Sequence, residues 1–301
     1  MKIFTSVLKR NVKMFFKDKG LFFTSLITPL ILLVLYATFL SNVYGDSIQN
    51  VFLGMGNPLP QKLLNGIVGG QLFSSLLAVS CVTVSFCSNM LMVQDKVSGA
   101  RRDMLITPVN RSTLALGYYV STLISTLIIC TVACIACIVY VACIGWYMTI
   151  SDVLLVFLDV FILVMFGTAL SSVINHFLSS QGQISAVGSI VSSVYGFICG
   201  AYMPLASFSE GLRNVLMFLP GTYCTSMIRN HTMQGALSEL AKTYPIEAVE
   251  GLKDTVDCNI YFFGNKVDIS TMYIVVIGAI VLLLSIYVLL HVLSKGRSKQ
   301  N

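Results

Sequence analysis

Residues 63–94, LLNGIVGGQLFSSLLAVSCVTVSFCSNMLMVQ, contain no charged residue and decide the class of this protein. The run is longer than the roughly 20 apolar residues that an α-helix needs to cross a bilayer. The whole chain has the same character: of its 301 residues 56% are hydrophobic and 11% are charged, and its mean hydropathy is +0.83. Soluble domains carry about 25% charged residues. The composition therefore indicates an integral membrane protein.

Apolar runs separated by polar segments predict an all-α membrane domain that occupies residues 1–301 as one unit. The six predicted spans are residues 21–43, 66–92, 113–142, 151–175, 184–203 and 271–293. Residues 44–62, which contain Pro58 and Pro60, predict a loop after the first span. Residues 205–270 form the longest predicted segment outside the spans, and we expect them on the extracellular side.

Residues 1–20 predict an amphipathic helix in the headgroup layer of the membrane. Apolar residues recur there at steps of three and four, among six cationic side chains. The apolar members are Phe4, Leu8, Val12, Phe15 and Phe16. A cytoplasmic tail with incidental apolar residues is the alternative.

The distribution of positive charge predicts the orientation. Residues 1–20, 94–111 and 294–301 hold 13 of the 19 Lys and Arg residues. The positive-inside rule places these segments, and hence both termini, in the cytoplasm of a multi-pass protein of the cell membrane. The net charge of +6 lies at the ends of apolar runs instead of forming a basic patch. Nucleic-acid binding is therefore not expected.

The charged segment of residues 94–108 predicts a short cytoplasmic helix between the second and third spans. Asp95 or Ser98 can cap this helix, and Pro108 stops it because the residue before a proline avoids helical geometry. Arg101 and Arg102 are offered to water or to a partner. From the residues alone, an ordinary positively charged loop and a helix that transmits force to both spans fit equally well.

This segment resembles the coupling helix of ABC type-2 permeases. Members of that family have an acidic and basic pair, then a glycine, a helical turn and a Leu-x-x-Pro ending, which Asp95, Lys96, Gly99, Leu105 and Pro108 match. Val97 and Arg101 depart from the usual pattern. The resemblance implies that the coupling residues, listed together, are Asp95, Lys96, Gly99, Arg101, Arg102, Leu105 and Pro108.

A second resemblance to the same family lies at the end of the fifth span. Gly200 and Pro204 match its Gly-x-x-x-Pro exit, and Pro220 and Tyr223 match a later Pro-x-x-Tyr. Between them the family has a re-entrant helical hairpin, so the resemblance implies that these four residues shape an outer hairpin and gate. Both prolines interrupt helices, and non-helical backbone at membrane depth has to be shielded by protein.

The family resemblance implies the permease subunit of an ATP-driven exporter, which is not itself an enzyme. No G-x-x-x-x-G-K-[ST] motif occurs, so this chain is not expected to bind a cofactor; ATP and Mg²⁺ belong to separate ATP-binding subunits docked on residues 95–108. A second permease, identical or related, would complete the path for an amphipathic drug, peptide or lipid. A lipid-linked polysaccharide exporter is an alternative, and an ion-coupled secondary transporter or channel is the rival from another class.

Few residues suggest chemistry within the spans. Asp159 is the only acid well inside one, and it has either a hydrogen-bonded structural role or a role in the substrate pathway. The cysteines at 130, 134 and 137 share a helix face and are expected to pack as small apolar residues, whereas a bridge between Cys224 and Cys258 stays open. The three histidines have no metal-site spacing, and no catalytic constellation is expected.

Overall fold

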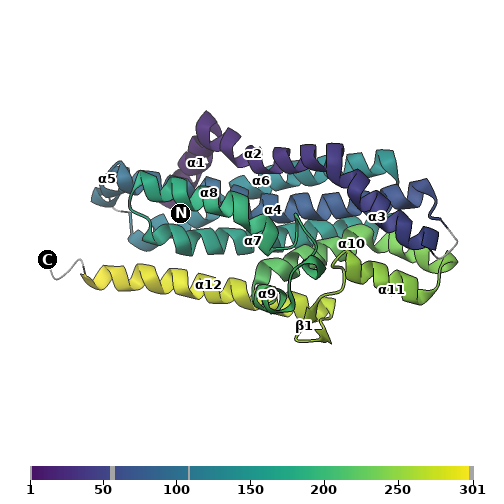
Figure 1. The fold of residues 1–301 in the computed structure, drawn as a ribbon. Coiled ribbons are helices and arrows are strands. Elements are labelled where there is room, and N and C mark those ends of the chain that lie inside the picture. Colours follow the sequence, from purple (N-terminus) through teal and green to yellow (C-terminus); the bar gives the residue numbers. More distant parts are fainter. Residues whose placement is uncertain (1, 55–57, 108, 298–301) are drawn as a thin grey trace.

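The computed structural model describes residues 2–54, 58–107 and 109–297, which are almost entirely helical. Figure 1 shows the long helices packed side by side along one direction. The start of α1 (Lys2–Lys17), the short α5 (Ala100–Ile106) and the end of α12 (Ile269–Arg297) lie toward one end of this bundle. Helices α3 (Ser41–Gly54) and α11 (Ile246–Thr255) lie toward the other end.

The first long helix begins at a cap and extends further than predicted. The Asp18 carboxylate accepts a hydrogen bond from the Leu21 amide at 3.1 Å and starts α2 (Lys19–Leu35), which continues through the π-helical turn η1 (Tyr36–Leu40) into α3. The segment of residues 44–62, for which the sequence predicts a loop, is therefore helical up to Gly54. Phe52 is buried in α3 and packs on Tyr244, with ring centroids 5.1 Å apart. This tertiary contact stabilises a helix that local sequence does not indicate.

Helix α4 (Gln61–Val97) lies at the centre of the molecule and is buried on all sides. It contacts α2, α6 (Arg111–Ile144), α7 (Ile150–Phe177), α8 (Gln181–Ile198) and α10 (Pro220–Thr243). Small residues allow these close approaches. A Cβ atom on Gly167 of α7, for example, would lie 3.0 Å from the Cys81 carbonyl oxygen of α4.

Capping side chains define the starts of α7 and α8. Thr149 and Asp152 form a capping box, in which each side chain accepts a hydrogen bond from the other residue's backbone amide. Ser180 accepts a hydrogen bond from the Gln183 amide at 3.3 Å and starts α8. The polar turn between these helices is therefore short and well defined.

Residues between α8 and α12 form a compact set of short elements around α10. The short elements are the 3-10 turn η2 (Leu205–Ser207), α9 (Glu210–Leu216), α11, and the strands β1 (Tyr261–Phe262) and β2 (Asn265–Lys266). The two strands pair antiparallel, with Tyr261 opposite Lys266. Helix α10 has 24 residues, so this region is more helical than a short hairpin.

Five helical stretches of the described residues are long and apolar enough to cross a membrane. They are Lys19–Gly54, Gln61–Val97, Arg111–Ile144, Ile150–Phe177 and Ile269–His291. Helix α8 covers most of the predicted fifth span but has only 18 residues, a length of about 27 Å. The protein is thus an all-helical membrane protein with about five long apolar helices, and a sixth span stays a prediction.

Candidate coupling and pathway sites

The turn between α4 and α5 depends on a glycine. Gly99 has φ +86°, a left-handed conformation, and its carbonyl accepts the Arg102 amide at 2.7 Å to begin α5. Residues with a Cβ rarely adopt this conformation. The predicted helix of residues 94–108 is therefore two elements, the end of α4 and the seven-residue α5. Pro108, its predicted stop, lies outside the described residues.

Asp95, at the end of α4, is buried and bound by two other helices. The Arg10 guanidinium of α1 donates to both carboxylate oxygens, at 2.6 and 2.9 Å, and the Tyr118 hydroxyl of α6 donates at 2.6 Å. The hydrogen bond with Asp95 raises the pKa of Arg10. Asp95 is only 3% exposed, so its carboxylate joins three helices within the subunit.

Lys96 reaches the end of α7. Its ammonium group donates to the Leu178 carbonyl at 2.8 Å and to the His176 carbonyl at 3.3 Å. A cation at a helix C-terminus is favourable, because the last carbonyls lack helical partners. Asp95 and Lys96, adjacent in sequence, thus fix the end of α4 to α1, α6 and α7. We call the segment from Asp95 to Thr107 the elbow.

The rest of the elbow divides into a packed side and an exposed side. Met104 and Leu105 are partly buried and pack on a cluster that contains Val7 and Tyr118. Arg102 and Asp103 are exposed, and Ile106 is 83% exposed. Arg101 is half-buried. The predicted coupling residues therefore include both residues that hold the elbow and residues that present a surface.

The predicted gate residues surround the start of α10. Gly200, with φ +73°, ends the turn after α8, and Pro204 precedes η2. Pro220 occupies the first turn of α10, where its missing amide costs nothing. The Tyr223 hydroxyl donates to the Met217 carbonyl at 2.6 Å, which closes the turn from α9.

A buried arginine fixes this region to α4. The Arg229 guanidinium of α10 is 1% exposed and donates to the Asp257 carboxylate at 3.2 Å and to the Gly200 carbonyl at 2.9 Å. It also donates to the Ser74 and Ser75 hydroxyls of α4, at 3.4 and 3.3 Å. Its ion-pair partner Asp257 lies 28 residues away, and no local pattern in the sequence indicates this pair.

Asp159 belongs to a buried polar cluster of three helices. Its carboxylate contacts the His231 Nδ1 of α10 at 2.6 Å and accepts the Tyr273 hydroxyl of α12 at 2.5 Å. Asp159 is 2% exposed. Both oxygens have partners, and neither partner was identified from the sequence. No local pattern indicates them, because they lie 72 and 114 residues away.

All nine cysteines are free thiols, and Cys224 and Cys258 are both buried without a bridge. Cys130, Cys134 and Cys137 pack in the main hydrophobic cluster. Among residues 2–54, 58–107 and 109–297, no group of three or more His, Cys, Asp or Glu side chains could hold a metal ion.

This arrangement defines a multi-pass membrane protein of packed helices, with a short charged elbow at one end and buried polar clusters within. The sequence profile of the ABC-2 type transporter family matches residues 3–232. The chain therefore belongs to that family and is a membrane permease without an ATPase domain. ATP is normally bound by a separate subunit in such transporters. A search of curated protein sequences gave no match.

Proposed function

We propose that this chain is the permease subunit of an ATP-driven exporter, with six spans and both termini in the cytoplasm. The sixth span would be α8, whose length of about 27 Å is close to the ~30 Å of a bilayer core. The start of α1, α5 and the end of α12 gather at one end of the bundle. That end carries the cationic segments, which favours the cytoplasm.

The elbow carries this proposal. A helix that receives force has to be exposed on one side and rigidly joined to the spans on the other. The exposed side chains of Arg102, Asp103 and Ile106 provide the first property. The bonds of Asp95 and Lys96 to α1, α6 and α7 provide the second.

ATP-binding subunits would dock on α5 and push it when they close on ATP. Gly99 would act as the pivot, and Leu105 would pass the displacement to the cluster beneath it. Through Asp95 the displacement reaches α1 and α6, and through Lys96 it reaches α7. A second permease would complete the path that these movements open.

A groove between α2 and α8 supports an amphipathic substrate. It has a volume of about 550 Å³ and combines aliphatic side chains with the hydroxyl groups of Thr28, Ser192, Ser193 and Tyr202. This lining is mostly apolar with a few hydroxyl-bearing residues, which suits a drug, peptide or lipid that is largely apolar and carries some polar groups. At its outer end, the region of Gly200, Pro204, Pro220 and Tyr223 would act as a gate.

The buried cluster of Asp159, His231 and Tyr273 favours the rival function, an ion-coupled transporter. Buried titratable groups are typical of such proteins. The two functions differ in their energy source. Reconstituted vesicles that export an amphipathic dye only with ATP and an ATP-binding subunit support the exporter, whereas transport by this chain alone under an ion gradient would overturn it.

Cross-linking tests the docking surface directly. An Ile106→Cys variant should form a cross-link with a cysteine placed on the ATP-binding subunit, and ATP should change its yield. The exposed native Cys143 near the far end of α6 is the internal control. A cross-link through Cys143 but none through position 106 would contradict the proposed coupling surface.

A further inference from the structure

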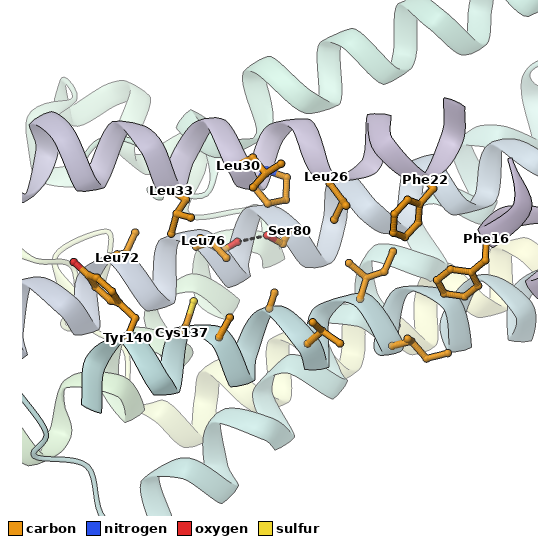
Figure 2. Close-up of a pocket in the computed structure, with 16 residues that line it drawn as sticks. Phe16, Phe22, Leu26, Leu30, Leu33, Leu72, Leu76, Ser80, Cys137 and Tyr140 are labelled. Atoms are coloured by element: carbon orange, nitrogen blue, oxygen red, sulfur yellow. Dashed lines mark hydrogen bonds between the residues drawn. The ribbon is translucent and has the colours of Figure 1, made fainter. Parts of the chain in front are cut away.

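An almost wholly apolar groove runs along the surface between α2 and α6, with α4 as its floor. Its volume is about 540 Å³. Figure 2 shows Phe16 and Phe22 at one end, Tyr140 at the other, and Leu26, Leu30 and Leu33 along one wall. The Ser80 hydroxyl on the floor is already bonded to the Leu76 carbonyl at 2.6 Å. The groove is separate from the one between α2 and α8 and shares no lining residue with it.

The length of this groove matches one leaflet of a bilayer. Along α6 it extends from Ile128 to Tyr140, a distance of about 18 Å at 1.5 Å per residue. One leaflet contributes about half of the ~30 Å hydrocarbon core. An acyl chain that enters at the α1 end would therefore reach the far end of the groove near the bilayer midplane.

Positive charge gathers at the α1 end. Lys13 lies one helical turn before Phe16, Lys17 follows Phe16, and Lys19 begins α2. All three side chains are exposed, and none takes part in an ion pair within the described residues. The one acid between them, Asp18, caps α2. An amphiphile whose chain fills the groove would have its headgroup beside these lysines.

We propose that this groove is a binding site for an anionic phospholipid of the leaflet that contains α1. The apolar walls hold an acyl chain, and Lys13, Lys17 and Lys19 hold the phosphate. A neutral lipid fits the groove but lacks the charge contact. An apolar helix of a second copy would cover the walls but would bring no negative charge to the lysines. The site is independent of which substrate the transporter exports.

Native mass spectrometry of the full-length protein tests this proposal. The protein in detergent is titrated with phosphatidylglycerol or with phosphatidylcholine of the same chains. We expect tighter retention of one phosphatidylglycerol. A Lys13→Gln, Lys17→Gln variant should weaken its retention about thirtyfold, because each lysine near an anionic headgroup contributes roughly 1 kcal/mol and about 1.4 kcal/mol is a tenfold change in affinity. Lys242→Gln, at an exposed lysine of α10, is the control for loss of a surface positive charge elsewhere.

A filling variant tests the apolar part. Ala136→Trp places a large side chain in the groove and should reduce retention of both lipids, whereas Ala142→Trp, exposed on another face of the same helix, should not. A phosphatidylglycerol with a photoreactive group in its chain should label peptides of α2 and α6 at the groove. The lysine variant leaves the packed core untouched, so it remains decisive if Ala136→Trp fails to fold.

Three outcomes would overturn the proposal. They are equal retention of the two lipids, labelling spread evenly over exposed faces such as that of Ile274 in α12, and loss of a dimer instead of a lipid in Ala136→Trp. Each can occur while ATP-driven export remains intact, so failure here is distinguishable from failure of the exporter function.

Discussion

The carboxylate of Asp95 lies in the segment that we predict to couple with ATP-binding subunits, but its contacts are all within this chain. Its position in the sequence pattern indicates coupling, yet it is buried and bound within the subunit by Arg10 and Tyr118. A carboxylate without partners in such a place is strongly destabilising. We therefore expect Asp95 to act through the helices that it joins.

Arg10→Ala should lower the free energy of unfolding by about 2 kcal/mol, less than the 3–5 kcal/mol for a fully buried pair, because the Arg10 side chain is 32% exposed. It should also uncouple ATP hydrolysis from transport. Lys9→Ala, an exposed neighbour, should change neither. Denaturant titration in detergent measures the first effect. Equal free energies of unfolding for the two variants would show that the ion pair of Arg10 and Asp95 contributes little to stability.

Arg229→Gln should be more damaging, with a loss of about 3 kcal/mol, because it leaves the buried Asp257 carboxylate unpaired. The exposed Lys242→Gln on the same helix should lose less than about 0.5 kcal/mol. The same titration, followed by limited proteolysis between α8 and α12, checks both. If Arg229→Gln remains as stable as Lys242→Gln, the buried bonds do not hold this region.

At the scale of elements, the junction between α4 and α5 depends on the left-handed conformation of Gly99. Gly99→Ala should destabilise this turn by about 1–2 kcal/mol and reduce ATP-driven transport without loss of ATP-subunit binding. Gly182→Ala, in open space at the start of α8, should be neutral or slightly stabilising. Transport assays in vesicles and co-purification separate the two effects. Full transport by Gly99→Ala would remove the pivot from the mechanism.

The positions of the helices could be predicted well from the sequence, but the side-chain contacts between helices could not. A helix covers all or most of each predicted apolar segment, because the hydropathy of a segment depends only on residues close together in the sequence. The extension of the first helix to Gly54 was missed, since it depends on the contact between Phe52 and Tyr244, 192 positions apart in the chain. The bonds of Asp95 to Arg10, 85 residues away, were missed for the same reason. The structure has a short helix, α5, within the segment of residues 94–108, and its role in coupling stays a prediction.

For the molecule as a whole, the cluster at Asp159 connects α7, α10 and α12. Asp159→Asn keeps an acceptor for Tyr273 but removes the charge beside His231. Because both carboxylate oxygens are occupied and buried, we expect a stability loss of about 2 kcal/mol with unchanged transport. Thermal unfolding and vesicle transport measure the two effects. Lost transport at normal stability would instead place Asp159 in the substrate pathway.

The enclosure of α4 has a consequence for biogenesis. Among the five candidate spans it has the lowest hydropathy, 1.9. Its Asn89 amide finds its acceptors, the Ser171 and Ser172 hydroxyls at 3.0 Å, only on α7. During synthesis α4 emerges before α7 and α10, so it meets lipid first with these groups unsatisfied. Before α7 and α10 are made, the helix that is enclosed in the folded protein is exposed to lipid with unsatisfied polar groups. We expect a membrane chaperone that shields a single polar helix to assist insertion at this stage.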